Sequence, residues 1–229
     1  MKKFFLKSLV GLFSLTFFFA ANHVPESELN SAVAIVTKVV NSVTFKSGSG
    51  AWGDLKVGTA LKSSDEIKTG DKSLVLVKFT DNSVVTVREN SVVKIYSEKD
   101  GNNVNKNTHV DAGQVVFDVK KQDGGDFKVT TPTLVASIRG TEFFINSSPE
   151  FTLFVLLSGY VDLQALLGAQ QAAALSGGNF VNVGPDGQII PEPNNQSVLN
   201  QVNTSKKTNL KRIILQSTAG DIVIEYFVD

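Results

Sequence analysis

The chain is patterned as short apolar runs separated by turn-forming residues. From Ala32 onward, β-branched and aromatic residues gather in runs such as LVLVKF, VVTV, QVVFDV and TEFFIN. Gly, Asn, Asp and Ser split these runs at intervals of about eight to twelve residues. The pattern predicts an all-β domain over residues 32–184, with many short strands forming a sandwich or a solenoid-like β-roll.

Three hexapeptides repeat one pattern of a polar residue, Ser, two apolar residues, a variable residue and then Val or Ile. They are KSLVLV, NSVVTV and NSVVKI, with their serines at Ser73, Ser83 and Ser91. Each Ser is expected to bond nearby backbone groups in the turn before its strand. Because alternate strand residues share a face, we expect one continuous inner face of six residues: Val75, Val77, Val85, Val87, Val93 and Ile95. A recognition surface is expected on the outward positions around Thr86, Arg88 and Lys94, and in the loops.

The last third of the chain is less regular. Gln164–Leu175 (QALLGAQQAAAL) is compatible with a short helix or with two weak strands around Gly168. Residues 185–207 begin with a segment rich in Pro and Asn and predict a linker or surface loop. Residues 208–229 predict a C-terminal β-hairpin, with strands at Lys211–Gln216 and Asp221–Val228 and a turn at Ala219 and Gly220.

The N-terminus has the pattern of an export signal. Lys2, Lys3 and Lys7 precede the uncharged run Ser8–Ala21, which is shorter than the roughly 20 residues of a membrane-spanning helix. We therefore predict a signal peptide at residues 1–21, a polar leader at 22–31, and a periplasmic or extracellular protein. A retained N-terminal anchor remains an alternative. Cleavage after Ala21 would place Phe19 at the third residue before the cleaved bond, where a small residue is preferred.

Charge and cysteine content narrow the function classes. The whole chain has 22 basic and 22 acidic residues and no cysteine. Removing residues 1–21 removes three lysines, which leaves 22 − 3 = 19 basic residues against 22 acidic ones. Such a mildly acidic chain has no surplus of basic residues for phosphate backbones, so we expect no nucleic-acid partner. Disulfides and thiolate metal sites are excluded.

Two long segments resemble the FecR domain family. The first carries a G-x-x-L segment, then D-x-I-x-T-G, and then Ser-led strands around a D-G-S-type turn in which Asn82 replaces Gly. The second carries G-x-V-x-F-x-V, then F-x-V-x-T-P, and then R-G-T-x-F. The resemblance covers roughly Ser31–Val183. Its positions in this chain are Gly58, Leu61, Asp65, Ile67, Thr69, Gly70, Ser73, Asp81, Ser83, Ser91, Gly113, Val115, Phe117, Val119, Phe127, Val129, Thr131, Pro132, Arg139, Gly140, Thr141 and Phe143.

The resemblance implies an extracytoplasmic all-β domain. The family's namesake is a sensor that controls a sigma factor and receives its signal from an outer-membrane iron-citrate receptor. Because the predicted signal begins at residue 1, we expect no cytoplasmic anti-sigma segment here. The chain is thus more similar to the family's stand-alone exported members.

Catalytic and metal-binding motifs are not apparent. The histidines are His23 and His109, and no G-x-S-x-G elbow accompanies them, so we predict no enzymatic activity; a hydrolase using His109 is the remaining alternative. Asp81, Asp100, Asp123 and Asp126 lack the ligand series of a calcium loop and are expected to form turns. We therefore predict no cofactor and no metal site.

Trp52 and Arg139 are the candidate partner contacts. Trp52 follows SGSGA, where an exposed ring could stack on a sugar or anchor a protein, although the usual burial of Trp favours packing at the edge of the core. Arg139 could contact a partner carboxylate, but pairing with a nearby acid or carbonyl is favoured.

The sequence therefore favours a non-enzymatic exported module that binds a protein or glycan of the cell envelope. The alternative is an accessory sensor in envelope or iron-uptake signalling.

Overall fold

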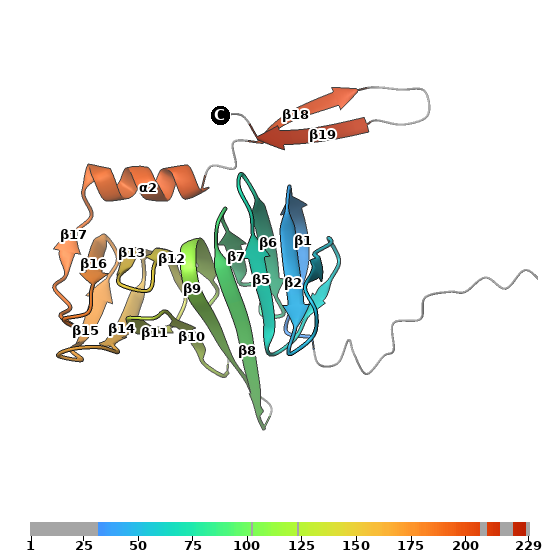
Figure 1. Ribbon diagram of the computed structural model, residues 1–229. Coiled ribbons are helices and arrows are strands. Elements are labelled where there is room, and N and C mark those ends of the chain that lie inside the picture. Colours follow the sequence, from blue (N-terminus) through green and yellow to red (C-terminus); the bar gives the residue numbers. More distant parts are fainter. Residues whose placement is uncertain (1–31, 102, 123, 207–209, 216–221, 228–229) are drawn as a thin grey trace, which may run out of the picture.

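Strands dominate the structure, which confirms the all-β prediction. The computed structural model describes residues 32–101, 103–122, 124–206, 210–215 and 222–227 (Figure 1). The strands between Ala34 and Pro193 form two layers, called layer A and layer B below, with a core between them. Their inner residues meet directly: the rings of Phe79 in layer A and Phe127 in layer B lie 5.4 Å apart, edge to face.

Layer A contains nine strand segments, eight of which are whole strands. In spatial order they are β4 (Ala60–Leu61), β1 (Ala34–Val40), β6 (Leu74–Phe79), β7 (Val84–Val87), the second part of β9 (Asn103–Val119), β12 (Thr141–Ser147), β13 (Thr152–Ser158), β16 (Asn179–Val183) and β17 (Glu192–Pro193).

Layer B contains the first part of β9 and eight further strands. In spatial order the layer runs through β3 (Gly53–Asp54), β2 (Val43–Ser47), β5 (Asp65–Thr69), β8 (Val92–Asp100), β9, β10 (Phe127–Thr130), β11 (Leu134–Ile138), β14 (Tyr160–Ala165) and β15 (Ala172–Ser176).

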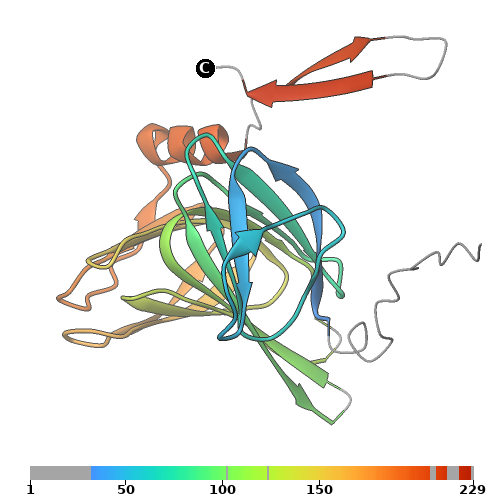
Figure 2. The same ribbon diagram turned by 45° about the vertical axis from the view of Figure 1, so that its right-hand side comes forward.

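Strand β9 passes from one layer to the other at Gly113. Up to Ala112 it pairs with β8 and, at its start, with β10; from Gly113 onward it pairs with β7 and β12. Gly113 has φ of 99°, and a Cβ atom there would lie 2.5 Å from Ser91 Cα. Only glycine fits such a close approach of two backbones. Gly113 thus lets one strand belong to both layers (Figure 2).

The Ser-led repeat forms walls of the core in both layers. All six predicted apolar residues are buried, as expected. They do not share one face, however: Val75, Val77, Val85 and Val87 belong to layer A, whereas Val93 and Ile95 face them from layer B. The outward positions Thr86 and Lys94 consequently lie on opposite sides of the molecule, because the chain changes layer between β7 and β8.

The residue before each serine of the repeat has a left-handed backbone. Lys72, Asn82 and Asn90 have φ of 51°, 66° and 53°. Ser73 and Ser91 then donate to the carbonyls of Asp71 and Glu89 at 3.0 and 3.1 Å. Since Asn tolerates this conformation well, the repeated NSVV is a turn followed by a core strand.

Helix α2 (Gln196–Lys206) covers part of the outer face of layer A (Figure 1). It contributes Val198 and Val202 to a second apolar cluster. The sheet contributes Val116, Phe144, Leu153, Val155 and Phe180. The prediction of a linker or loop is therefore wrong for Gln196–Lys206, because these valines, spaced by four residues, form an apolar helix face that packs on the sheet.

The two remaining C-terminal predictions have different outcomes. Residues 164–175 form the end of β14 and the start of β15 around Gly168, so the two-strand alternative is correct. The last strands, β18 (Leu210–Leu215) and β19 (Ile222–Phe227), pair antiparallel in a sheet of their own, as the predicted hairpin requires. Its predicted turn lies outside the described residues.

The predicted signal peptide and leader also lie outside the described residues, and their boundaries stay predictions. Among the residues that are described, no helix has the length and apolar character needed to cross a membrane.

Candidate functional site

The outer face of layer B carries a row of polar side chains across five strands. The register places Lys46, Glu66, Lys94, His109 and Thr130 side by side on β2, β5, β8, β9 and β10. The Lys46 ammonium lies 3.0 Å from a Glu66 carboxylate oxygen. No helix or strand of the described residues packs over this row, so it forms a polar surface open to a partner.

Trp52 lies at one end of this face. Its side chain is 41% exposed, and the ammonium groups of Lys46 and Lys68 lie 5.0 and 5.2 Å from its ring centroid. The prediction that Trp52 packs at the edge of the core is therefore wrong. Gly50 and Gly53 flank a short loop that carries the ring onto the outer surface, where cation–π contacts hold it.

Tyr96 lies two residues beyond Lys94 on β8 and is 36% exposed. The Lys94 ammonium lies 5.2 Å from the Tyr96 ring. The contact with the Tyr96 hydroxyl raises the pKa of Lys94, and the carboxylates of Glu66 and Asp111 add to this. This lysine stays positively charged at physiological pH.

The β8–β9 hairpin projects beyond the body of the molecule (Figure 2). A hollow of about 480 Å³ lies beside Tyr96 on this hairpin. It is lined by Ser63, Tyr96, Ser97, Glu98, Asn105, Lys106, Asn107, Asp126 and Lys128. We call this hollow the β8–β10 groove. Its volume falls within the range of small-ligand sites, roughly 300–1,000 Å³.

Asn105 and Asn107 are held in place from behind. The Asn105 side-chain oxygen accepts a hydrogen bond from the Asp126 amide at 2.9 Å, and the Asn107 oxygen accepts one from Thr130 Oγ1 at 3.2 Å. Engaging the two oxygens fixes both carboxamides and directs their NH₂ donors away from these contacts.

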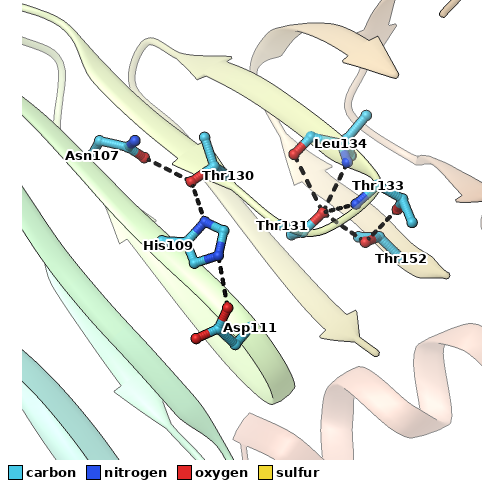
Figure 3. A network of polar contacts seen from close by, with 8 residues as sticks. All are labelled: Asn107, His109, Asp111, Thr130, Thr131, Thr133, Leu134 and Thr152. Carbon is cyan, nitrogen blue, oxygen red and sulfur yellow. Dashed lines mark hydrogen bonds and ion pairs between the residues drawn. The ribbon is translucent and has the colours of Figure 1, made fainter. Parts of the chain in front are cut away.

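His109 joins this network from the next outward-facing position on β9, two residues after Asn107 (Figure 3). Its Nδ1 lies 2.7 Å from Thr130 Oγ1, and its Nε2 lies 2.8 Å from Asp111 Oδ1. The order Asp–His–Thr is that of a hydrolytic triad, but the Thr130 hydroxyl donates its proton to Asn107. His109 thus links β9 to β10 through Thr130.

A separate hydroxyl cluster is buried at the T-P motif (Figure 3). Thr152 Oγ1 lies 2.7 Å from Thr131 Oγ1 and accepts from Thr133 Oγ1 at 2.8 Å. Thr133 also donates to the Val183 carbonyl at 3.1 Å. These bonds tie the turn at the half-buried Pro132 to layer A, which is a structural role.

Asp81 forms a nearly buried ion pair. Lys106, only 5% exposed, donates to Asp81 at 2.9 Å and to Gln122 at 3.0 Å. Burial alone would raise the pKa of Asp81, but the Lys106 ammonium and hydrogen bonds from Ser83 lower it below its ordinary value. Asp81 thus has two structural roles: it accepts a hydrogen bond from the Ser83 amide in the turn, and it neutralises Lys106 beneath the groove.

The other motif positions lie in turns and core rather than in the groove. Ile67 and Phe143 are core residues, and Asp65, Thr69, Ser73, Ser83, Ser91 and Thr141 are buried polar residues. Asp65 accepts from Ser47 Oγ at 2.7 Å and from the Lys62 amide at 2.8 Å, which closes the turn before β5. Gly70 donates its amide to Ser42 at 2.9 Å, and Gly140 has φ of 65°.

Arg139 differs from the expectation of a half-buried, paired side chain. It is exposed, and the described residues show no ion pair to it. A partner contact through Arg139 stays a prediction. Asp123 lies outside the described residues, and within them no cluster of three His, Asp or Glu side chains is placed to hold a metal ion.

The groove residues were not predicted as a site from the sequence. The sequence carries little signal of it, because NVNKNTH is polar at every position except Val104. Only the structure shows that Lys106 and Thr108 are buried and that Asn105, Asn107 and His109 therefore share the open face.

Comparison with known proteins supports the fold and the family. Residues 65–162 match the family model described as FecR protein, which confirms the resemblance over that range; all groove residues except Ser63 lie within it. A search of the curated proteins found no match.

Two solved structures from Parabacteroides distasonis ATCC 8503, both described as a "putative anti-sigma factor", are similar to this chain. The first has a TM-score of 0.51 and 17% identity, and the match covers 60% of this chain and 64% of that one. The second has a TM-score of 0.49 and 13% identity, and covers 72% and 99%. The chain thus spans less than two thirds of the first structure, which is evidence for the fold alone.

Proposed function

Because the chain carries a FecR domain at residues 65–162, we propose that it is a non-catalytic recognition module of the cell envelope. The observation that carries this proposal is the open outer face of layer B, with two exposed aromatic rings and the β8–β10 groove. The motif residues build turns and core, so the surface they support is free to bind another molecule.

A partner is expected to contact this face rather than the outer face of layer A under α2. Exposed Trp and Tyr side chains beside cationic groups are typical anchors of binding surfaces. Export through the predicted signal peptide belongs to the same proposal, as does a protein or glycan of the envelope as partner.

The test is a pull-down from envelope extract with the immobilised full chain. We expect a specific protein or glycan that is lost with a Trp52→Ala/Tyr96→Ala variant. The matched control is Tyr160→Ala, which removes an exposed ring on the same layer outside the groove. Recovery of nothing specific by the wild type contradicts the proposal.

A second candidate is an accessory sensor in envelope or iron-uptake signalling. It is supported by the FecR match and by the description of the similar solved structures. Deleting the gene should then change iron-responsive transcripts, and unchanged transcripts contradict this candidate. A neighbouring sigma-factor gene would favour it over a purely adhesive role.

A further inference from the structure

We propose that the β8–β10 groove binds a neutral oligosaccharide; this rests on the proposed recognition function and names the class of its ligand. The groove combines an exposed aromatic ring, fixed carboxamides and a small net charge in one hollow of about 480 Å³.

The charge balance argues against strongly charged ligands. Lys106 and Lys128 line the groove together with Glu98 and Asp126. Asp81 neutralises the buried Lys106 at 2.9 Å, so the open lining has one cation against two carboxylates, a formal charge of about −1. A polyanion gains no attraction from such a surface and a polycation gains only a weak one, whereas a neutral ligand is not penalised.

The strand arrangement argues against a peptide bound by strand addition. Strand β9 pairs with β8 and β10, and β10 pairs with β9 and β11, so neither has a free edge in the floor of the groove. Strand β8 pairs with β5 only up to Lys94, but beyond it the Ser63 hydroxyl accepts from the Ser97 amide at 2.9 Å and donates to the Ser97 carbonyl at 3.0 Å. The backbone groups that an added strand would need at Ser97 are thus already engaged. The described lining also contains no aliphatic side chain, so it offers no pocket for the apolar anchor of a peptide.

The remaining groups match the chemistry of a sugar ring. Every hydroxyl of a sugar both donates and accepts hydrogen bonds. Asn105, Asn107 and Lys128 supply donors, while Glu98 and Asp126 supply acceptors. The apolar C–H side of the ring requires a flat surface, which the exposed ring of Tyr96 provides.

Trp52 extends the same face beyond the groove. It lies over Lys46 on β2 and Lys68 on β5, whereas Tyr96 is on β8, the next strand after β5. Neighbouring strands are about 4.8 Å apart, and Tyr96 lies two to four residues along β8 from the positions opposite Glu66 and Lys68. The two rings are therefore roughly 10–15 Å from each other. This spacing suits an extended chain of several sugar units rather than a single one.

The test is a calorimetric titration of the full chain with three neutral tetrasaccharides: cellotetraose, maltotetraose and fully N-acetylated chitotetraose. At least one is expected to bind. Tyr96→Ala and Asn107→Ala should each weaken that binding roughly 10- to 30-fold, the effect of losing an anchoring contact. Tyr96→Phe should stay within about threefold, because the ring remains.

The control variant Tyr160→Ala should leave the affinity unchanged, since this ring is 75% exposed and lies outside the groove. Thermal unfolding of each variant checks that the fold is intact. Binding of none of the three probes overturns the inference, and so does binding that Tyr96→Ala does not alter.

The two proposals fail separately. If no saccharide binds but a protein recovered from extract is lost with Tyr96→Ala, the glycan inference is wrong and the recognition function stands. If neither a saccharide nor any specific extract component is bound, both are wrong.

Discussion

The two outer faces of the molecule are made by the same strand alternation, yet a helix packs on only one of them, over part of its area, among the described residues. On layer A, Val116, Phe144 and Val155 point outward and pack under α2. On layer B, the corresponding outward positions are occupied by Lys94, His109 and Thr130. Strand β9 contributes to both faces, so the covered and the open face can be compared along one strand.

Before Gly113, β9 alternates partly exposed and buried residues; after it, Val115, Val116 and Phe117 are buried in succession. A run without alternation indicates a strand covered on both sides, and an alternating strand has one open side. The outer face of layer A is therefore a stability element, while that of layer B is available for binding. The predictions below test this division.

Gly113→Ala is expected to have the largest effect, because it breaks the strand that joins the faces. The new Cβ would lie 2.5 Å from Ser91 Cα, at a backbone φ of 99°. We expect a loss of more than about 4 kcal/mol in the free energy of unfolding, or no folded protein. Gly58→Ala is the matched control: φ is 88°, but nothing lies within 4 Å of its Cβ, so about 1–2 kcal/mol is expected in chemical denaturation.

Phe144→Ala tests the covered face. Its ring is fully buried between β12 and α2, and removing it should cost about 3–5 kcal/mol in urea unfolding. Tyr160→Ala, which removes a larger and mostly exposed ring from layer B, should cost less than about 0.5 kcal/mol. Equal losses for the two variants would contradict the division between the faces.

Asp81→Asn tests the ion pair beside the groove. Because Lys106 is almost completely buried, leaving it unpaired should cost about 3 kcal/mol at neutral pH. The folded pKa of Asp81 is lowered, so its stabilisation is complete above the unfolded value of about 4 and is lost as pH falls through the folded pKa.

The difference in stability between wild type and Asp81→Asn should accordingly stay constant from about pH 7 to pH 5 and shrink below about pH 4. Asp118→Asn breaks an exposed pair with Lys120 and serves as the control, with an expected change of at most about 1 kcal/mol. A constant difference down to pH 2 would mean that the carboxylate does not carry the effect.

His109→Ala is expected to have the smallest effect. Its ring is partly exposed and bridges Thr130 and Asp111, so the loss should be about 1 kcal/mol or less in thermal unfolding. Any hydrolytic activity found in the purified chain should survive the substitution. An activity that disappears with the imidazole while the fold is intact would revive the enzymatic alternative.

Local pattern predicted much of this fold. The six core residues of the Ser-led repeat and the C-terminal strands followed from alternation and turn chemistry. The layer change between β7 and β8 did not, because alternation reports which side of a strand is buried and not which sheet the strand joins. Helix α2 was missed because prolines dominate the segment just before it.

The site was less predictable than the fold. The FecR motif includes Asp65, Ser91 and Gly113, which fix the conformation of turns and of β9 and do not line the groove. Asn105, Asn107 and Tyr96 can be recognised as one site only from the pairing of β8, β9 and β10, which brings them into the same groove. Trp52 was expected at the edge of the core. Its surface position depends on contacts with Lys46 and Lys68, which are distant in sequence from each other and could not be predicted from composition.

The passage of β9 from one layer to the other has a consequence for how the molecule folds. A repetitive β protein stacked only on its nearest neighbours can lose repeats one at a time. Here a single strand is hydrogen-bonded to β8 and β10 in one layer and to β7 and β12 in the other. Neither layer can complete its ladder without the other, so residues 32–183 are expected to gain and lose structure together, in one cooperative transition.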